Sequence, residues 1–175
     1  MTDLRDVVED DRGIIKRIQL AIPGYRGYRK REDLRIADSL LRNELYKLLG
    51  HVENDARAVQ KRLAEQMAMK RLDRFKGVVY DLQNYRNRVR HAPQEYTGVS
   101  ADHRITEEEL ERMYGYDLRL FDSVDVLKAE IAALGAEMDD PAFAAKVASV
   151  REMLRQLLEA LDMRRETIAG IMVSR

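Results

Sequence analysis

Residues 110–171 contain two heptad patterns of apolar residues, separated by Asp140 and Pro141. The first comprises Leu110, Met113, Asp117, Leu120, Val124, Leu127, Ile131, Leu134 and Met138. The second comprises Phe143, Val147, Val150, Leu154, Leu157, Leu161, Arg164, Ile168 and Ile171. Steps of three and four residues place each set along one side of a helix and are typical of helices that pack together. The sequence therefore predicts a helical hairpin over residues 106–173.

Each heptad pattern contains one charged residue, Asp117 in the first and Arg164 in the second. If the chain reverses at residues 139–141, these two residues lie opposite each other. A polar residue in such a seam commonly fixes the register of the helices and lowers their stability relative to an apolar pair. We therefore interpret Asp117 and Arg164 as a structural ion pair. The alternatives are a functional role, or two side chains that both reach solvent.

Start signals mark both helices of the predicted hairpin. Thr106 and Glu109 have the spacing of a capping box, in which each side chain accepts a hydrogen bond from the other residue's backbone. Asp140 is expected to cap the second helix, with Pro141 at its first helical position. The first helix is thus predicted to begin directly after Thr106.

Residues 31–91 form the longest helical tract between two prolines. Its first apolar pattern comprises Leu34, Ala37, Leu41, Leu45, Leu48, Val52, Ala56, Val59, Leu63 and Met67. These steps repeat every 11 residues, as in a nearly straight helix, and the pattern passes Gly50 without losing phase. A second pattern then follows, comprising Ala68, Leu72, Phe75, Val79, Leu82, Arg86 and Val89. The change of phase within residues 66–71 leaves two alternatives, a helix pair joined by a tight turn or one long helix.

The remaining segments complete an all-α prediction. We expect an N-terminal helix over residues 3–21, a basic turn over residues 22–31 and a loop over residues 92–105. Together with the tracts above, this predicts an antiparallel helical bundle or coiled coil of four to five helices. Residues 1–175 are expected to form a single domain.

Composition excludes several kinds of site. The chain has no Cys, so it has no disulfide, thiolate metal site or cysteine nucleophile, and its three His are not at metal-ligand spacing. We therefore expect no metal or cofactor. No signal peptide and no apolar run near 18 residues is seen, which predicts a soluble cytoplasmic protein.

The 31 basic and 31 acidic residues are unevenly distributed. Residues 57–91 contain ten Lys or Arg against three Asp or Glu, whereas residues 102–140 contain four against twelve. Helices that lie side by side would explain this as complementary charge. The alternative is a basic face that remains free for an anionic partner.

The basic turn contains the best surface candidate for a binding site. Its anion-binding candidates are Tyr25, Arg26, Tyr28, Arg29, Lys30 and Arg31. Guanidinium groups bind phosphates in bidentate fashion, tyrosines stack on bases, and the neighbouring glycines let backbone N–H groups approach an anion. Nucleic acid and an anionic membrane surface are both candidate ligands. The alternative is a turn whose tyrosines pack on the bundle while its basic groups are solvated.

Arg86, Asn87 and His91 resemble the R-N-x-x-x-H motif of HEPN ribonucleases. In that family the arginine holds the scissile phosphate and the histidine acts in acid–base cleavage of RNA. A regular helix would place Arg86 and His91 about 140° apart, so this activity would require a distorted helix or a dimer. Arg86 also falls on the apolar seam, where a core arginine whose tip reaches water is the simpler explanation.

A second resemblance rests on short motifs across half of the chain. They are Pro23-Gly24-Tyr25, Arg88-Val89-Arg90, Tyr96-Thr97-Gly98, Glu108-Glu109-Leu110, Tyr114 and Asp117-Leu118. In these motifs the chain is similar to a family of uncharacterised helical proteins of bacteria and archaea. The resemblance implies no known activity. Members resemble partners of membrane-scaffold (SPFH-type) systems more than enzymes.

The sequence favours a non-catalytic helical scaffold or adaptor that binds a protein partner or itself. Its basic segment, residues 24–31, would contact an anionic surface. One alternative is the HEPN-like ribonuclease. The other is a dedicated RNA- or DNA-binding module that would combine the basic segment with Arg86, Arg88 and Arg90.

Overall fold

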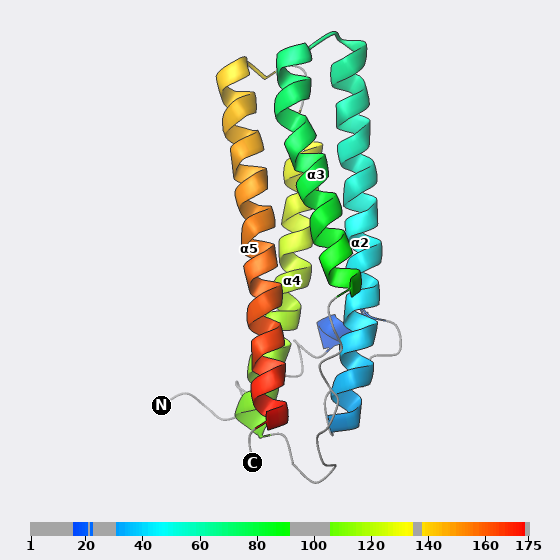
Figure 1. The fold of residues 1–175 in the computed structure, drawn as a ribbon, viewed down its shortest axis with the longest axis vertical. Helices are drawn as coiled ribbons and strands as arrows, with labels where there is room; N and C mark the ends of the chain where they lie inside the picture. The colour runs from blue at the N-terminus through cyan, green and yellow to red at the C-terminus, as the bar shows by residue number, and fades with distance from the viewer. Residues whose placement is uncertain (1–15, 21, 23–30, 92–105, 135–137, 174–175) are drawn as a thin grey trace. The chain divides into compact units, whose positions relative to one another are not determined.

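The computed structural model describes residues 16–20, 22, 31–91, 106–134 and 138–173, and these residues are all-α, as predicted (Figure 1). Residues 16–20 are helical. The longer helices are α2 (Arg31–Glu65), α3 (Met69–His91), α4 (Glu107–Ala132) and α5 (Asp140–Val173). None of the described helices is both long enough and apolar enough to cross a membrane.

The chain divides into two compact units. Unit 1 comprises residues 1–44, 93–120 and 160–175, and unit 2 comprises residues 45–92 and 121–159. The helices α2, α4 and α5 contribute residues to both units, whereas all of α3 belongs to unit 2.

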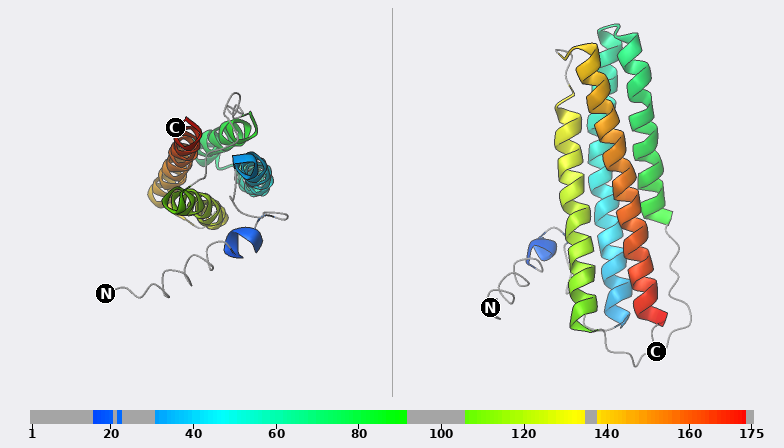
Figure 2. Two further views of the ribbon diagram at one scale, coloured as in Figure 1. Left: turned by 90° about the horizontal axis from the view of Figure 1, so that it is seen from below. Right: turned by 90° about the vertical axis from the view of Figure 1, so that its left-hand side faces the viewer.

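The tract from residue 31 to residue 91 is a pair of helices joined by a tight turn in unit 2. The Ala68 N–H donates to the Leu63 carbonyl at 2.9 Å and the Met67 N–H donates to the Ala64 carbonyl at 3.0 Å. These two bonds form a Schellman motif, the usual end of a helix that stops abruptly. Met67 lies in the left-handed region, with φ 54°, where glycine is the usual residue. The chain then reverses, and α3 runs back along α2 (Figure 2).

Apolar side chains from four helices form the core of unit 2. The buried residues of α4 and α5, together with Leu134 just after α4, are Phe121, Val124, Leu127, Ile131, Leu134, Phe143, Val147, Val150, Leu154 and Leu157. Those of α2 and α3 are Leu45, Leu49, Val52, Ala56, Val59, Leu63, Phe75, Val78, Val79, Leu82, Tyr85 and Val89. The seams predicted for α4 and α5 are therefore confirmed over this range. The α2 helix passes Gly50 without interruption, also as predicted.

The predicted seam of α2 was wrong at two positions. Leu49 is fully buried, whereas Leu48, which was expected inside, is only half-buried. From Leu45 to Leu63 the buried residues follow steps of four and three, so this stretch is a heptad seam rather than an 11-residue one. Met67 was also expected inside but is 81% exposed, because the helix has already ended in the turn.

Unit 1 has an apolar core of its own among the described residues. Its buried apolar residues are Ile18, Ile22, Ala37, Leu41, Met113, Leu120 and Leu161. Three charged side chains, Asp38, Asp117 and Arg164, are buried with them. This unit therefore combines apolar packing with a buried ionic group.

The two helix starts differ in how well they were predicted. The capping box of α4 is confirmed, since the Thr106 N–H donates to Glu109 Oε2 at 2.8 Å and the Glu109 N–H donates to Thr106 Oγ1 at 3.3 Å. The predicted cap of α5 was wrong by one residue. Asp139 Oδ1 accepts the Ala142 N–H at 2.7 Å, and the Asp139 carbonyl accepts the first helical hydrogen bond, from the Phe143 N–H. Asp140 is then the first helical residue, and its carboxylate accepts a hydrogen bond from Arg71.

This assignment predicts the effect of removing either carboxylate. Asp139→Ala is expected to lower the free energy of unfolding by about 1 kcal/mol, since the helix loses its N-cap. Asp140→Ala removes only an exposed ion pair and is expected to have the smaller effect. Urea unfolding followed by circular dichroism measures both variants. A larger loss in Asp140→Ala would show that Asp140 is the cap.

Candidate functional site

The basic segment lies outside the described residues. This applies to Tyr25, Arg26, Tyr28, Arg29 and Lys30. The backbone of Arg31 begins α2, but its side chain is also outside the described part of the chain. The role expected for these residues in binding an anion therefore stays a prediction.

In unit 1, Arg164 of α5 is buried against carboxylates from two other helices. Its Nε lies 2.6 Å from Asp117 Oδ1 of α4, and its Nη1 pairs with Asp38 Oδ1 of α2. Arg42, one turn after Asp38, places its Nη2 2.8 Å from Asp38 Oδ2. Arg164 is only 2% exposed and Asp117 is fully buried. Two guanidinium groups thus meet two carboxylates in a nearly water-free environment.

The heptad patterns predicted that Asp117 lies opposite Arg164, but they gave no indication that Asp38 joins the pair. A signal was present, because Asp38 stands three residues before Leu41, in the phase of the buried positions that continue to Leu45 and Leu49. Its spacing to Arg42 instead has the form of an ordinary surface pair one helical turn apart. Arg164 and Asp117 are almost completely buried and pair with each other, which favours a structural role.

The buried cluster predicts opposite results for single and double substitution. Arg164→Leu removes a guanidinium that two buried carboxylates share, and it is expected to lower the free energy of unfolding by roughly 3–5 kcal/mol. The double variant Asp117→Leu/Arg164→Leu leaves Asp38 with Arg42 and is expected to unfold near the wild-type denaturant concentration. Chemical unfolding measures both. A double variant as unstable as the single one would show that this ion pair contributes net stability.

A second polar cluster, in unit 2, is centred on Glu53 of α2. Arg57 Nη2 lies 2.8 Å and Gln83 Nε2 3.1 Å from Glu53 Oε1, and Arg86 Nη1 lies 2.9 Å from Oε2. The Arg86 guanidinium also lies 4.1 Å from the centre of the Tyr46 ring, and its Nε donates to the Tyr46 carbonyl. It can lie this close to α2 because Gly50 has no side chain. A Cβ at Gly50 would be 3.1 Å from Arg86 Nη2.

The Glu53 cluster keeps its carboxylate charged. Burial alone would raise the pKa of Glu53, but hydrogen bonds from Arg57, Gln83 and Arg86 outweigh burial, so the pKa lies below its usual value. A carboxyl group whose pKa is lower in the folded than in the unfolded state stabilises the fold above its unfolded pKa. This contribution is lost as the pH falls through the folded pKa.

Stability should therefore depend on Glu53 at acid pH. As the pH falls below about 4.5, the wild type is expected to lose free energy of unfolding more steeply than Glu53→Gln, which has no proton to gain there. Urea unfolding at a series of pH values between neutral and pH 3 measures the two slopes. Glu65→Gln, an exchange at an exposed position of the same helix, is the matched control. Equal slopes for the wild type and Glu53→Gln would contradict the assignment.

The residues of the ribonuclease-like motif do not converge within α3. The helix continues to His91, and Arg86 is turned toward α2, whereas Asn87 and His91 are exposed. Arg88 and Arg90 also separate. Arg90 Nη1 lies 3.3 Å from the hydroxyl of Tyr46, on the α2 side, and Arg88 faces α5. Residues two positions apart in a helix differ by about 200° around its axis. Arg88 therefore points to the opposite side of α3 from Arg86 and Arg90.

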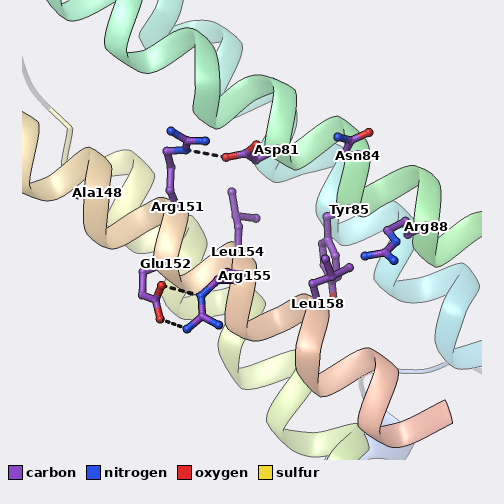
Figure 3. Close-up of a pocket in the computed structure, with 10 residues that line it drawn as sticks. All are labelled: Asp81, Asn84, Tyr85, Arg88, Ala148, Arg151, Glu152, Leu154, Arg155 and Leu158. Carbon is purple, nitrogen blue, oxygen red and sulfur yellow. Dashed lines mark hydrogen bonds and ion pairs between the residues drawn. The ribbon is translucent and has the colours of Figure 1, made fainter. Parts of the chain in front are cut away.

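A surface groove of about 820 Å³ lies between α3 and α5 in unit 2 (Figure 3). Its apolar lining consists of Tyr85, Ala148, Leu154 and Leu158. The Tyr85 hydroxyl is within 3.4 Å of the Leu157 carbonyl, a contact that joins α3 to α5 beneath the groove. This arrangement provides apolar surface at the bottom of a groove between two helices.

Charged side chains of both signs surround the apolar lining of the groove. Arg151 Nε lies 2.7 Å from Asp81 Oδ2, an ion pair across the groove, and Arg155 pairs with Glu152 along α5 (Figure 3). Arg88 forms no ion pair with any described residue. The groove therefore contains one arginine whose charge is not matched within the described part of the chain.

Sequence reasoning did not identify the groove. The lining residues come from helices separated by a third of the chain, and each is ordinary by itself. Among the described residues, no group of three or more acidic or histidine side chains is arranged to hold a metal ion. Comparison with known proteins found no matching family model, no matching curated protein and no matching solved structure. The fold and the groove define the chain only as an all-α helical protein.

Proposed function

We propose that this protein is a non-catalytic helical scaffold that associates with a second copy of itself through the groove between α3 and α5. The observation that carries the proposal is the groove, which combines an apolar lining with surrounding charges of both signs. Self-association would cover Leu158, which is only half-buried, and give Arg88 an acidic partner.

The arrangement of charge favours a second copy over a purely anionic ligand. An anionic ligand in the groove would meet Asp81 and Glu152 as well as the arginines. In a twofold-symmetric dimer the same patch serves both chains, so one end of the groove faces the other end in the second copy. Arg88 lies toward one end and Glu152 toward the other (Figure 3). The symmetric contact would thus join Arg88 of each copy to Glu152 of the other.

The scaffold would use its basic segment for a different contact. Residues 24–31 supply cations and tyrosines, which supports binding of an anionic partner such as nucleic acid, protein or lipid headgroups. The cytoplasmic location expected from the sequence belongs to the same proposal. Catalysis through Arg86 is disfavoured, because Glu53 and Tyr46 already hold its guanidinium.

Sedimentation velocity over a range of protein concentrations tests the proposal. The wild type is expected to form a dimer, and Leu158→Glu is expected to raise the dissociation constant at least tenfold, because it places a charge in the apolar lining. Val126→Glu changes another exposed apolar residue of unit 2, on α4, and is the matched control that should leave the dimer intact. A monomeric wild type at all concentrations would contradict the proposal.

Charge reversal tests the pairing itself. Arg88→Glu and Glu152→Arg, each alone, would place like charges together twice in the dimer and are expected to be monomeric. A mixture of the two variants restores both opposite-charge contacts and is expected to form a heterodimer. If the variants stay apart when mixed, while the wild type dimerises, the interface lies elsewhere.

A further inference from the structure

The turn between α2 and α3 lies at one end of the helix pair (Figure 2). Two methionines, Met67 in the turn and Met69 at the start of α3, are exposed there. Met67 is 81% exposed and Met69 is 55% exposed. Met67 has φ 54°, which disfavours any residue with a side chain. If only the fold mattered, glycine would be the better residue at this position of the turn. A methionine in an unfavourable backbone conformation, with its side chain in water, indicates that the side chain has a use of its own.

Basic residues flank these two methionines in the sequence. Arg62, Lys70 and Arg74 are exposed and form no ion pair with a described residue. We define these three cations, together with Met67 and Met69, as the methionine tip.

Three acidic side chains of α2, α3 and α5 near the methionine tip already form ion pairs. Glu65 pairs with Lys61 at 3.7 Å, Asp73 with Lys76 at 2.7 Å, and Asp140 with Arg71 at 2.6 Å. Hydrogen bonding from Arg71 lowers the pKa of Asp140, and Lys70 and Arg74 act in the same direction. Asp139, which caps α5, is a further carboxylate beside Asp140. Arg62, Lys70 and Arg74 nevertheless have no ion-pair partner among the described residues, which leaves their cations available to an anionic partner.

We propose that the methionine tip binds the surface of a membrane that contains anionic lipids. The two methionines would enter the boundary between headgroups and acyl chains, where a flexible apolar side chain loses contact with water. Arg62, Lys70 and Arg74 would stay at the headgroup level and pair with lipid phosphates. No helix has to cross the membrane for this mode of binding.

The shape and chemistry of the tip favour a lipid surface over other anionic partners. A three-residue turn at the end of two helices projects outward, and a deformable lipid surface can accommodate such a projection. Nucleic acid would contact the cations but would leave the methionines in water. Binding of nucleic acid would therefore not explain the exposed methionines or the unfavourable φ of Met67. This inference is independent of the groove between α3 and α5.

A single tryptophan reporter provides the most direct test, since the chain contains no Trp. In Met69→Trp, vesicles of phosphatidylcholine mixed with phosphatidylglycerol are expected to shift the fluorescence to shorter wavelength. Vesicles of phosphatidylcholine alone should not. Met163→Trp, at a position 50% exposed on α5, is the matched control and should show no shift. This readout separates the tip from any contact that residues 24–31 make with lipid.

Co-sedimentation with the same vesicles tests the contribution of each component. Met67→Gly/Met69→Gln removes the apolar side chains and relieves the strained backbone, so the variant should fold as the wild type does. Its binding to anionic vesicles should fall on the order of tenfold or more. Lys70→Glu/Arg74→Glu should lose the preference for anionic lipid. The proposal is overturned if the tryptophan at residue 69 does not respond, or if Met67→Gly/Met69→Gln binds as tightly as the wild type.

Discussion

A guanidinium group that is buried away from water must find acceptors within the protein, and Arg164 finds them on two other helices. Asp117 and Asp38 can reach it only if α4 and α2 present those positions at the level of Arg164 in unit 1. An apolar layer would tolerate a shift of one helix along another, whereas an unmatched buried charge would not. The position of the buried charges thus limits how the three helices of this unit can be aligned. Leucine layers alone would not impose that limit.

Unit 2 also buries a charged group among partners of opposite charge, but here the buried group is negative. Its buried centre is the carboxylate of Glu53, and the groups around it are the donors of Arg57, Gln83 and Arg86. In both clusters, charged side chains that could otherwise be catalytic or binding groups are held in internal ion pairs. Among the described residues, the surfaces proposed to contact other molecules are the groove between α3 and α5 and the methionine tip, both in unit 2.

Regular packing made α4 and α5 predictable from the sequence, while local choices made other parts unpredictable. The heptad spacing in α4 and α5 defines a single apolar side for each helix, so the buried side can be predicted. In α2, Leu48 and Leu49 are adjacent and equally apolar, so only the neighbouring helices decide which of them faces inward. The turn after α2 could not be located, because Met67 occupies the position where glycine would have marked it. Of the groups discussed as sites, the sequence could indicate Asp117 and Arg164 through their heptad phase. The groove depends on the proximity of two distant helices, which no local pattern encodes.

The close approach of Arg86 to α2 links two positions that are far apart in the chain. The guanidinium lies close to where a side chain at residue 50 would begin. Glycine at this position lowers the stability of the helix, but it allows this contact with Arg86. In related sequences the two positions should change together. A chain with a shorter residue at position 86 would have room for alanine at position 50, whereas a chain that keeps the arginine would have to shift its guanidinium away from the new Cβ. Covariation of residues 50 and 86 would then be the evolutionary trace of a hydrogen-bonded arginine rather than of a catalytic one.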